Sequence, residues 1–89
     1  SEAIGLLVAL LSDAPSHVPS LQLLARLLAK AGRKRELLKV TEQECKLTDS
    51  PMRKARLLHR IGELAEEQGD AAKARASFEA AVEAVDDYQ

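Results

Sequence analysis

Three side chains in this sequence are suited to nucleophilic or metal chemistry: one cysteine, Cys45, and two histidines, His17 and His59. A cysteine nucleophile needs a histidine partner and partial exposure to solvent. Cys45 falls on the apolar stripe of a predicted helix, where cysteine usually serves as a small hydrophobic residue. No glycine-rich loop follows a strand pattern to cradle a phosphate. We therefore expect that the protein is not an enzyme and binds no cofactor.

A second group of residues has the side-chain types of metal ligands and the spacing of one helix face. His59, Glu63 and Glu67 are four residues apart, so they share one helix face. They provide half of a metal site at most, because metal-binding helices usually offer more histidine or cysteine ligands. The alternative is a row of solvated charges, with Arg60 supporting Glu63 at i,i+3. We favour the solvated charges and expect no bound metal.

Basic residues gather around one glycine, which suggests either a patch for an acidic partner or nucleic acid, or ordinary helix surface. The members of this cluster around Gly32 are Lys30, Arg33, Lys34 and Arg35, and Arg26 lies one turn upstream of Lys30. No aromatic residue is interleaved to stack on bases. The chain has 13 basic and 14 acidic residues, whereas nucleic-acid binding usually leaves a strong basic excess. We therefore expect no nucleic-acid partner.

Length and composition describe one small folded domain. The chain has 89 residues, 46% hydrophobic and 30% charged, which favours a soluble folded protein over a disordered one. The longest apolar run, Leu6 to Leu11, is far shorter than the roughly 20 residues that span a bilayer. The start, Ser1-Glu2, lacks the basic region of a secretory signal, so we expect a cytoplasmic protein. Without an initiator methionine, the chain also reads as a piece of a longer protein, and its alanine, leucine and arginine content suggests a bacterial source.

Apolar residues spaced three and four apart predict five helices and no strand. Neither period-two runs nor a hairpin dipeptide is found. The stripes, one helix after another, are Ile4, Leu7, Val8, Leu10 and Leu11; Leu21, Leu24, Leu27 and Leu28; Leu37, Leu38, Thr41, Cys45 and Leu47; Leu57, Leu58, Ile61, Leu64 and Ala65; and Ala74, Phe78, Ala81, Val82 and Val85.

Local signals mark where these helices begin and end. Residues 12–19 carry two prolines and two serines and predict a loop. Gly32 and Gly69-Asp70 predict helix ends, because glycine adopts the left-handed conformation of a helix C-terminus, and Asp70 then caps the fifth helix. Ser50 predicts an N-cap followed by Pro51 in the first helical position. Such short connections make neighbouring helices antiparallel, so the fold class is all-α, built from helical hairpins.

The apolar pattern repeats along the chain. Leu21, Leu24, Ala25 and Leu28 precede Gly32 as Leu58, Ile61, Gly62 and Ala65 precede Gly69. The pattern after each glycine also recurs, and equivalent positions Ala3 and Leu37 lie 34 residues apart, whereas Leu37 and Ala74 lie 37 apart. The three extra residues, near Met52 to Lys54, are expected to lengthen the fourth helix.

On these residues the chain resembles the tetratricopeptide repeat family, whose pattern is W-x₂-L-G-x₂-Y, A-x₃-F and P over about 34 residues. In residues 55–88, Leu58 stands in the tryptophan place, Ile61-Gly62 for Leu-Gly, Ala65 for the tyrosine, Ala74 and Phe78 for A-x₃-F, and Asp86 for the proline. Residues 18–51 resemble a more degenerate repeat, through Ala25, Leu37 and Thr41. Residues 1–17 resemble the second helix of a truncated repeat, with Pro15 in the proline place.

The resemblance implies one domain, residues 1–89, in which about five helices form half a repeat plus two repeats, stacked as a right-handed superhelix. Small residues at Ala25, Gly62, Ala74 and Ala81 would let helix backbones approach closely. A single hairpin cannot bury its apolar face alone, so neighbouring hairpins must stack.

The resemblance also implies a concave, partner-binding surface lined by the first helix of each repeat. The corresponding residues are Gln22, Arg26, Lys30, Arg56, His59, Arg60, Glu63 and Glu67. This groove would be basic at one end and acidic at the other, which suits an acidic peptide or one with charges of both signs. Family members that clamp a carboxylate use asparagine, and this chain has none. For every groove residue, solvated helix surface is the alternative.

Three functions remain open on the sequence alone. The first is a non-catalytic interaction module that binds a protein or peptide partner within a longer protein. The second is a structural or self-association segment, in which uncovered apolar faces of the first and fifth helices form a homodimer. The third is a regulatory repeat domain attached to an enzyme.

Overall fold

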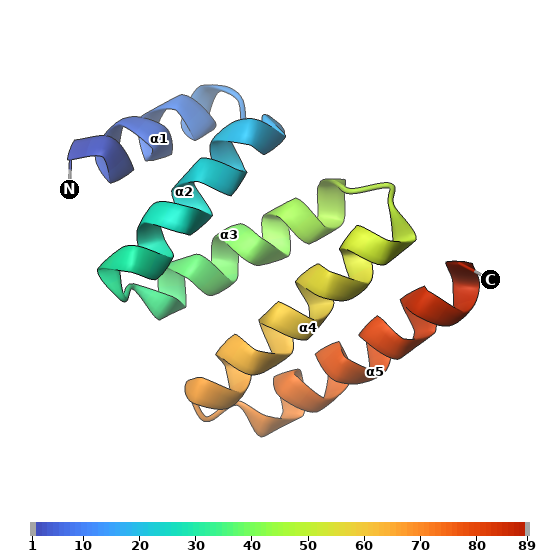
Figure 1. Cartoon of the computed structure of the whole chain (residues 1–89). Coiled ribbons are helices and arrows are strands. Elements are labelled where there is room, and N and C mark those ends of the chain that lie inside the picture. Colours follow the sequence, from blue (N-terminus) through green and yellow to red (C-terminus); the bar gives the residue numbers. More distant parts are fainter. Residues whose placement is uncertain (1, 89) are drawn as a thin grey trace. The chain divides into compact units, whose positions relative to one another are not determined.

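The structure, a computed structural model, describes the backbone of residues 2–88 and the side chains of residues 2–86. The described chain is all-α and contains five helices and no strand (Figure 1). The helices are α1 (Glu2–Asp13), α2 (Val18–Ala31), α3 (Lys34–Leu47), α4 (Pro51–Glu67) and α5 (Ala71–Tyr88). The predicted all-α class, the number of helices and the absence of a sheet in residues 2–88 are therefore confirmed.

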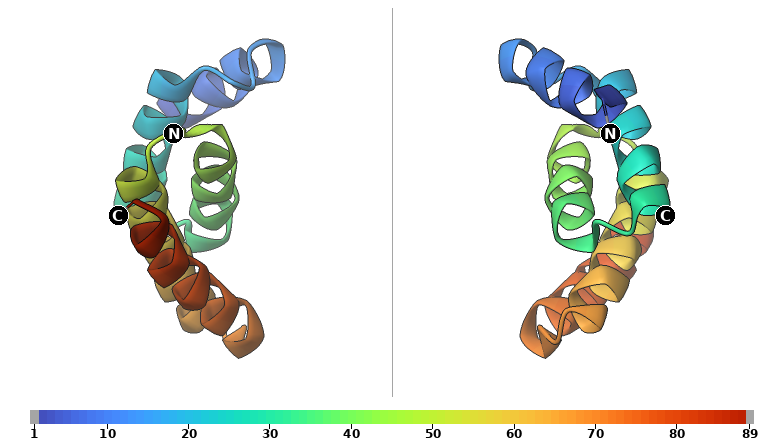
Figure 2. Two further views of the ribbon diagram at one scale, coloured as in Figure 1. Left: turned by 90° about the vertical axis from the view of Figure 1, so that its right-hand side faces the viewer. Right: turned by 90° about the vertical axis from the view of Figure 1, so that its left-hand side faces the viewer.

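The chain divides into two compact units, one ending at Leu47 and the other beginning at Thr48. In the first unit α1 packs on α2 and α2 packs on α3; in the second, α4 packs on α5. Each pair is a hairpin of antiparallel neighbours, and α4 and α5 lie side by side in Figure 1 and one in front of the other in Figure 2. The short connections therefore produce the expected hairpins within each unit.

The two predicted glycine turns have the same geometry. Gly32 and Gly69 adopt left-handed φ angles of 72° and 81°, which a side chain would disfavour. In each turn the residue after the glycine donates its backbone N–H to the carbonyl five residues earlier, closing the helix end. These pairs are Arg33 to Leu28, at 3.0 Å, and Asp70 to Ala65, at 2.9 Å. The equivalence of the two glycines, predicted from the repeat, is confirmed.

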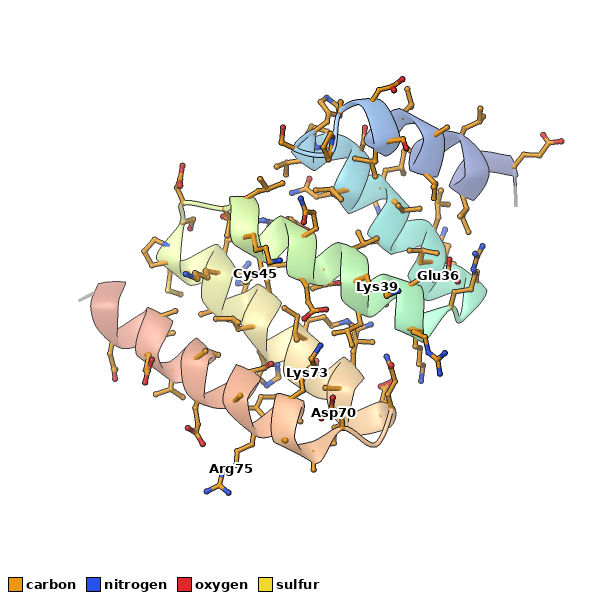
Figure 3. The ribbon with its side chains drawn as sticks, turned by 180° about the vertical axis from the view of Figure 1, so that it is seen from behind. Glu36, Lys39, Cys45, Asp70, Lys73 and Arg75 are labelled. Carbon is orange, nitrogen blue, oxygen red and sulfur yellow. The ribbon has the colours of Figure 1, made fainter. Side chains whose placement is uncertain are left out.

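Side-chain caps begin both helices of the second unit as predicted. The Ser50 hydroxyl accepts a hydrogen bond from the Arg53 backbone N–H at 3.2 Å, and Pro51 is the first residue of α4. The Asp70 carboxylate accepts one from the Lys73 backbone N–H at 3.0 Å, at the turn labelled in Figure 3. These caps satisfy backbone donors that have no partner inside the helix.

The predicted loop over residues 12–19 was too long. The helix α1 continues through Ser12 to Asp13, and α2 already begins at Val18. Pro19 therefore lies in the first turn of α2, where a proline is tolerated because the first helical N–H groups have no partner inside the helix. The expected lengthening of the fourth helix is confirmed, since α4 has 17 residues and α2 has 14.

The core of the first unit is built mainly of leucines from α2 and α3. Its buried apolar residues are Ile4, Leu7, Leu21, Leu24, Leu28, Leu37, Leu38 and Cys45. Cys45 is 8% exposed, which confirms its assignment as a small core residue. Glu44, which the apolar pattern did not place inside, is also buried at 4% exposure.

In the second unit the two helices meet at a glycine. A methyl group on Gly62 of α4 would lie only 2.5 Å from Cε1 of the Phe78 ring on α5. Glycine at this position therefore lets the ring lie against the helix backbone. On the same two helices Leu64 and Ala65 are fully buried, and Ala74 is 4% exposed. The predicted close approach at Gly62 is confirmed.

Two predicted stripes are only partly covered. On α5, Val82 is 62% exposed and Val85 is 36% exposed; on α1, Val8 and Leu10 are 53% and 58% exposed. These exposed residues agree with the uncovered apolar faces that the sequence leads us to expect on the first and fifth helices. The physical reason is that α1 packs on α2 and α5 packs on α4 within their units, and one neighbour covers only one side of a wide apolar stripe.

We predict that the effect of Gly62→Ala depends on Phe78. In the native chain the new methyl group must displace the ring, and overpacking of this kind costs about 1–3 kcal/mol. In a Phe78→Ala background the obstacle is absent, so the same change should stabilise α4 by about 1 kcal/mol through helix propensity. Urea unfolding of the four proteins of this double-mutant cycle measures the coupling.

A coupling near zero would contradict the described contact. The matched control is the exposed Gly5, where a methyl group would have no neighbouring atom within 4 Å. Gly5→Ala should stabilise the protein to the same extent in both backgrounds.

Candidate functional site

The most distinctive surface feature of the second unit is an apolar groove between α4 and α5, with a volume of about 480 Å³. We call it the α4/α5 groove. Its lining residues are Met52, Ala55, Arg56, His59, Phe78, Ala81, Val82, Val85 and Asp86. Six of these are apolar, and the three polar ones are Arg56 and His59 from α4 and Asp86 from α5.

Residue size explains why this surface is hollow. Ala55 and Ala81 are 7% and 9% exposed and form the low floor, since neither has atoms beyond Cβ. Met52, 42% exposed, stands on one side, and Val82 stands on the other. The lining positions on each helix are mostly three or four residues apart, so each helix presents a single face to the groove.

A second, smaller hollow adjoins the groove at Phe78. It has a volume of about 370 Å³ and is lined by Glu66, Gly69, Ala71, Ala74, Arg75, Phe78 and Glu79. Because the Phe78 ring lines both hollows, they meet along one face of the hairpin. Arg75 extends away from α5 (Figure 3), and its Nε donates to Glu79 Oε1 at 3.2 Å.

His59 connects the apolar lining to the charged residues of α4. Its ring centroid lies 5.3 Å from that of Phe78, with the two planes tilted by 56°. Its Nδ1 is 3.6 Å from Glu63 Oε1, and Arg60 Nη1 is 3.9 Å from the same oxygen. The expected pairing of Arg60 with Glu63 is confirmed, but exposed pairs of this kind contribute little to stability.

The predicted partner-contact residues fall into two groups. Gln22, Arg26 and Lys30 lie on α2 in the first unit, and Arg56, His59, Arg60, Glu63 and Glu67 lie on α4 in the second; all eight are exposed. Of these, Arg56 and His59 line the α4/α5 groove. The sequence reasoning did not name Met52, Val82 and Val85 as partner-contact residues, because it sought such residues among the polar side chains of α2 and α4. The available signal was the width of the α5 stripe.

Gln22 has a partner inside its own unit. Its side-chain amide Nε2 donates to Glu44 Oε2 on α3 at 3.1 Å, which helps to satisfy a carboxylate that is only 4% exposed. A buried carboxylate needs such partners because leaving water is costly for a charge. This bond gives Gln22 a structural role, and its role in partner contact stays a prediction.

The remaining chemistry-bearing residues are engaged locally. Cys45 is buried, and His17 Nδ1 lies 2.6 Å from the Ser20 hydroxyl oxygen. In residues 2–86 no group of three or more histidine, cysteine or acidic side chains is placed to hold one metal ion. In the basic cluster, Arg33 donates to both carboxylate oxygens of Glu36, from Nε at 2.7 Å and from Nη2 at 2.5 Å.

Comparisons with known proteins leave the chain without an assigned family. No protein-family model matches it, and no curated protein matches it in sequence. The tetratricopeptide resemblance therefore rests on the residues quoted above and stays a prediction. Across the described helices, none combines the length and apolarity required to cross a membrane.

We predict that Gln22→Ala destabilises the first unit by about 1 kcal/mol, because Glu44 loses a hydrogen-bond donor in a nearly dry environment. Thermal unfolding followed by circular dichroism measures the effect. Arg26→Ala, one turn along the same helix and exposed, is the matched control and should leave stability within about 0.5 kcal/mol of the native value. Equal effects of the two substitutions would contradict the structural role of Gln22.

Proposed function

We propose that this chain is a non-catalytic protein–protein interaction module that binds a helical peptide or protein segment along the α4/α5 groove. The observation that carries the proposal is an apolar surface hollow bordered by exposed Arg56 and His59. Apolar surface that is left uncovered and rimmed by polar groups is typical of a site that another macromolecule covers. Such an interface would gain free energy from its apolar centre and orientation from its charged rim.

The groove suits an amphipathic helix. The lining residues of α4 run from Met52 to His59, which is about 10 Å or two helical turns. A partner helix would place apolar anchors at positions i, i+3 or i+4, and i+7 against this length. The shallow floor at Ala55 and Ala81 leaves room for leucine-sized anchors.

Charge on α4 favours a partner with acidic residues at one end. Arg56 and Arg60 are exposed within the first ten residues of the helix, whereas Glu63 and Glu67 are exposed within the last seven. A segment lying along α4 with its acidic residues near Arg56 meets opposite charges, and the reverse orientation brings like charges together. Rim charges of this kind select orientation and raise the association rate more than they raise affinity.

We also propose that the chain is part of a repeat array within a longer protein, with its helical hairpins stacked as the tetratricopeptide resemblance implies. The shared geometry of the Gly32 and Gly69 turns supports it, since two hairpins of the chain close in the same way. In such an array Gln22, Arg26 and Lys30 would be the partner-contact residues of the first unit. A self-association segment is the second candidate, and the exposed Leu6 and Leu10 of α1 favour it.

A synthetic probe tests the groove directly. The probe is a fluorescein-labelled helical peptide with leucines at i, i+3 and i+7 and glutamates on the flanking positions, and its binding is followed by fluorescence anisotropy. We predict that Val82→Glu weakens binding at least roughly ten-fold, because it places a charge on the apolar wall of the groove. Arg56→Glu with Arg60→Glu should weaken it about five-fold and reduce its salt dependence.

The matched control for the charge reversal is Arg35→Glu with Lys46→Glu, two exposed basic residues on α3. This pair changes the net charge of the chain by the same amount and should leave binding unchanged. An equal loss in both double variants would mean that the probe responds to overall charge. Retained binding in folded Val82→Glu protein would remove the α4/α5 groove as the site.

A further inference from the structure

The helix α1 is apolar on two sides. Ile4 and Leu7 are buried in the first unit, while Leu6 is 67% exposed and Leu10 is 58% exposed. Helices that are apolar on all sides are normally covered on all sides. The solvent side of α1 is therefore a surface that lacks a cover in the described structure.

Leu6 and Leu10 form a ridge with Ala3, since positions three and four apart share one helix face. We call these three residues the α1 ridge. The exposed Val8 is not part of it, because Val8 lines a separate hollow of about 310 Å³ with Pro15, Leu21 and Val40 of its own unit. The ridge thus projects from the unit, whereas the α4/α5 groove is recessed.

The ridge and the groove match in length. Ala3 to Leu10 on α1 comprises eight residues, as does Met52 to His59 on α4, and both segments are about 10 Å long in a helix. Leu6 and Leu10 lie one helical turn apart, so both side chains can enter a groove that is two turns long. The small floor residues Ala55 and Ala81 leave the space that these side chains need.

The charged residues beside the ridge are opposite in sign to those on the α4 side of the groove. The only charged residues of α1 are Glu2 and Asp13, both acidic and both exposed. The first ten residues of α4 contain no acidic residue, and their basic ones are Arg53, Lys54, Arg56 and Arg60. Asp86, on the α5 side, is the one acidic residue of the groove lining. A docked α1 is therefore best placed with Glu2 and Asp13 on the α4 side of the groove.

We propose that the α1 ridge of one copy of this chain docks into the α4/α5 groove of a second copy. This inference rests on the proposed function of the groove and names its partner. Because ridge and groove are different surfaces, the contact is head-to-tail: a chain that receives a ridge still presents its own. One helix in a short groove covers less than the roughly 800 Å² per partner of a standard interface, so the association is expected at micromolar or higher concentrations.

Complementary variants test the contact. Leu6→Glu with Leu10→Glu blocks the ridge, and Val82→Glu blocks the groove. The native 89-residue chain should show a mass that rises with concentration in light scattering, and each variant alone should remain monomeric. An equimolar mixture of the two variants retains one intact ridge and one intact groove, so it should form a species of two chains that does not grow further.

Matched controls carry the same type of change elsewhere. Leu23→Glu replaces a leucine on α2 that is 44% exposed, and Ala76→Glu lies on α5 outside the groove lining. Both should associate like the native chain. Circular dichroism checks that each variant is folded, and Leu6→Gln with Leu10→Gln replaces the glutamate pair if that pair unfolds.

The inference is overturned if the native chain stays monomeric well above the micromolar range, up to about 1 mM. It is also overturned if the mixed variants stay monomeric while the native chain associates, or if the Val82→Glu variant associates like the native chain. The leucine–glutamate probe separates this failure from failure of the proposed function. Binding of the probe to the ridge-blocked monomer, without self-association of the native chain, retains the groove as a site and rejects the second copy as its partner. Absence of both rejects the groove itself.

Discussion

The contact between the Phe78 ring and the backbone of α4 at Gly62 determines the geometry of the second unit. Without a Cβ at Gly62, α4 and α5 approach closely enough for the ring to lie against the helix. On the side of Ala55 and Ala81, the small side chains that accompany this approach leave a hollow. The same close packing that holds the hairpin together therefore produces the groove on its surface, and Phe78 takes part in both.

A second constraint is that α1 and α5 each pack on a single helix within their own unit. Both α1 and α5 have more apolar surface than α2 or α4 covers, so Leu6, Leu10 and Val82 remain exposed. In repeat proteins such faces are covered by the next element, because a single hairpin cannot bury its apolar surface alone. Uncovered faces of this kind explain why binding, to a partner or to a second copy, is the function that the surface supports best.

Charged residues beside these apolar surfaces would favour one orientation of a bound helix over the other. The N-terminal half of α4 is basic and its C-terminal half is acidic, whereas the charged residues of α1 are all acidic. Apolar contact provides most of the free energy of such an interface, but it does not distinguish between orientations. In the proposed interface the charged residues beside the groove would supply that distinction, and Arg56 and His59 are the basic and imidazole side chains that line it.

The sequence by itself determined the elements and their ends. Five helices, the left-handed turns at Gly32 and Gly69, the caps at Ser50 and Asp70, and the burial of Cys45 follow from helical periodicity and from contacts between residues close in the chain. Tertiary structure alone decided which side of each stripe is covered. The Gln22–Glu44 hydrogen bond, the exposure of Val82 and the groove depend on which helices pack together and at what distance, and periodicity within one helix carries no information about the extent of its neighbours.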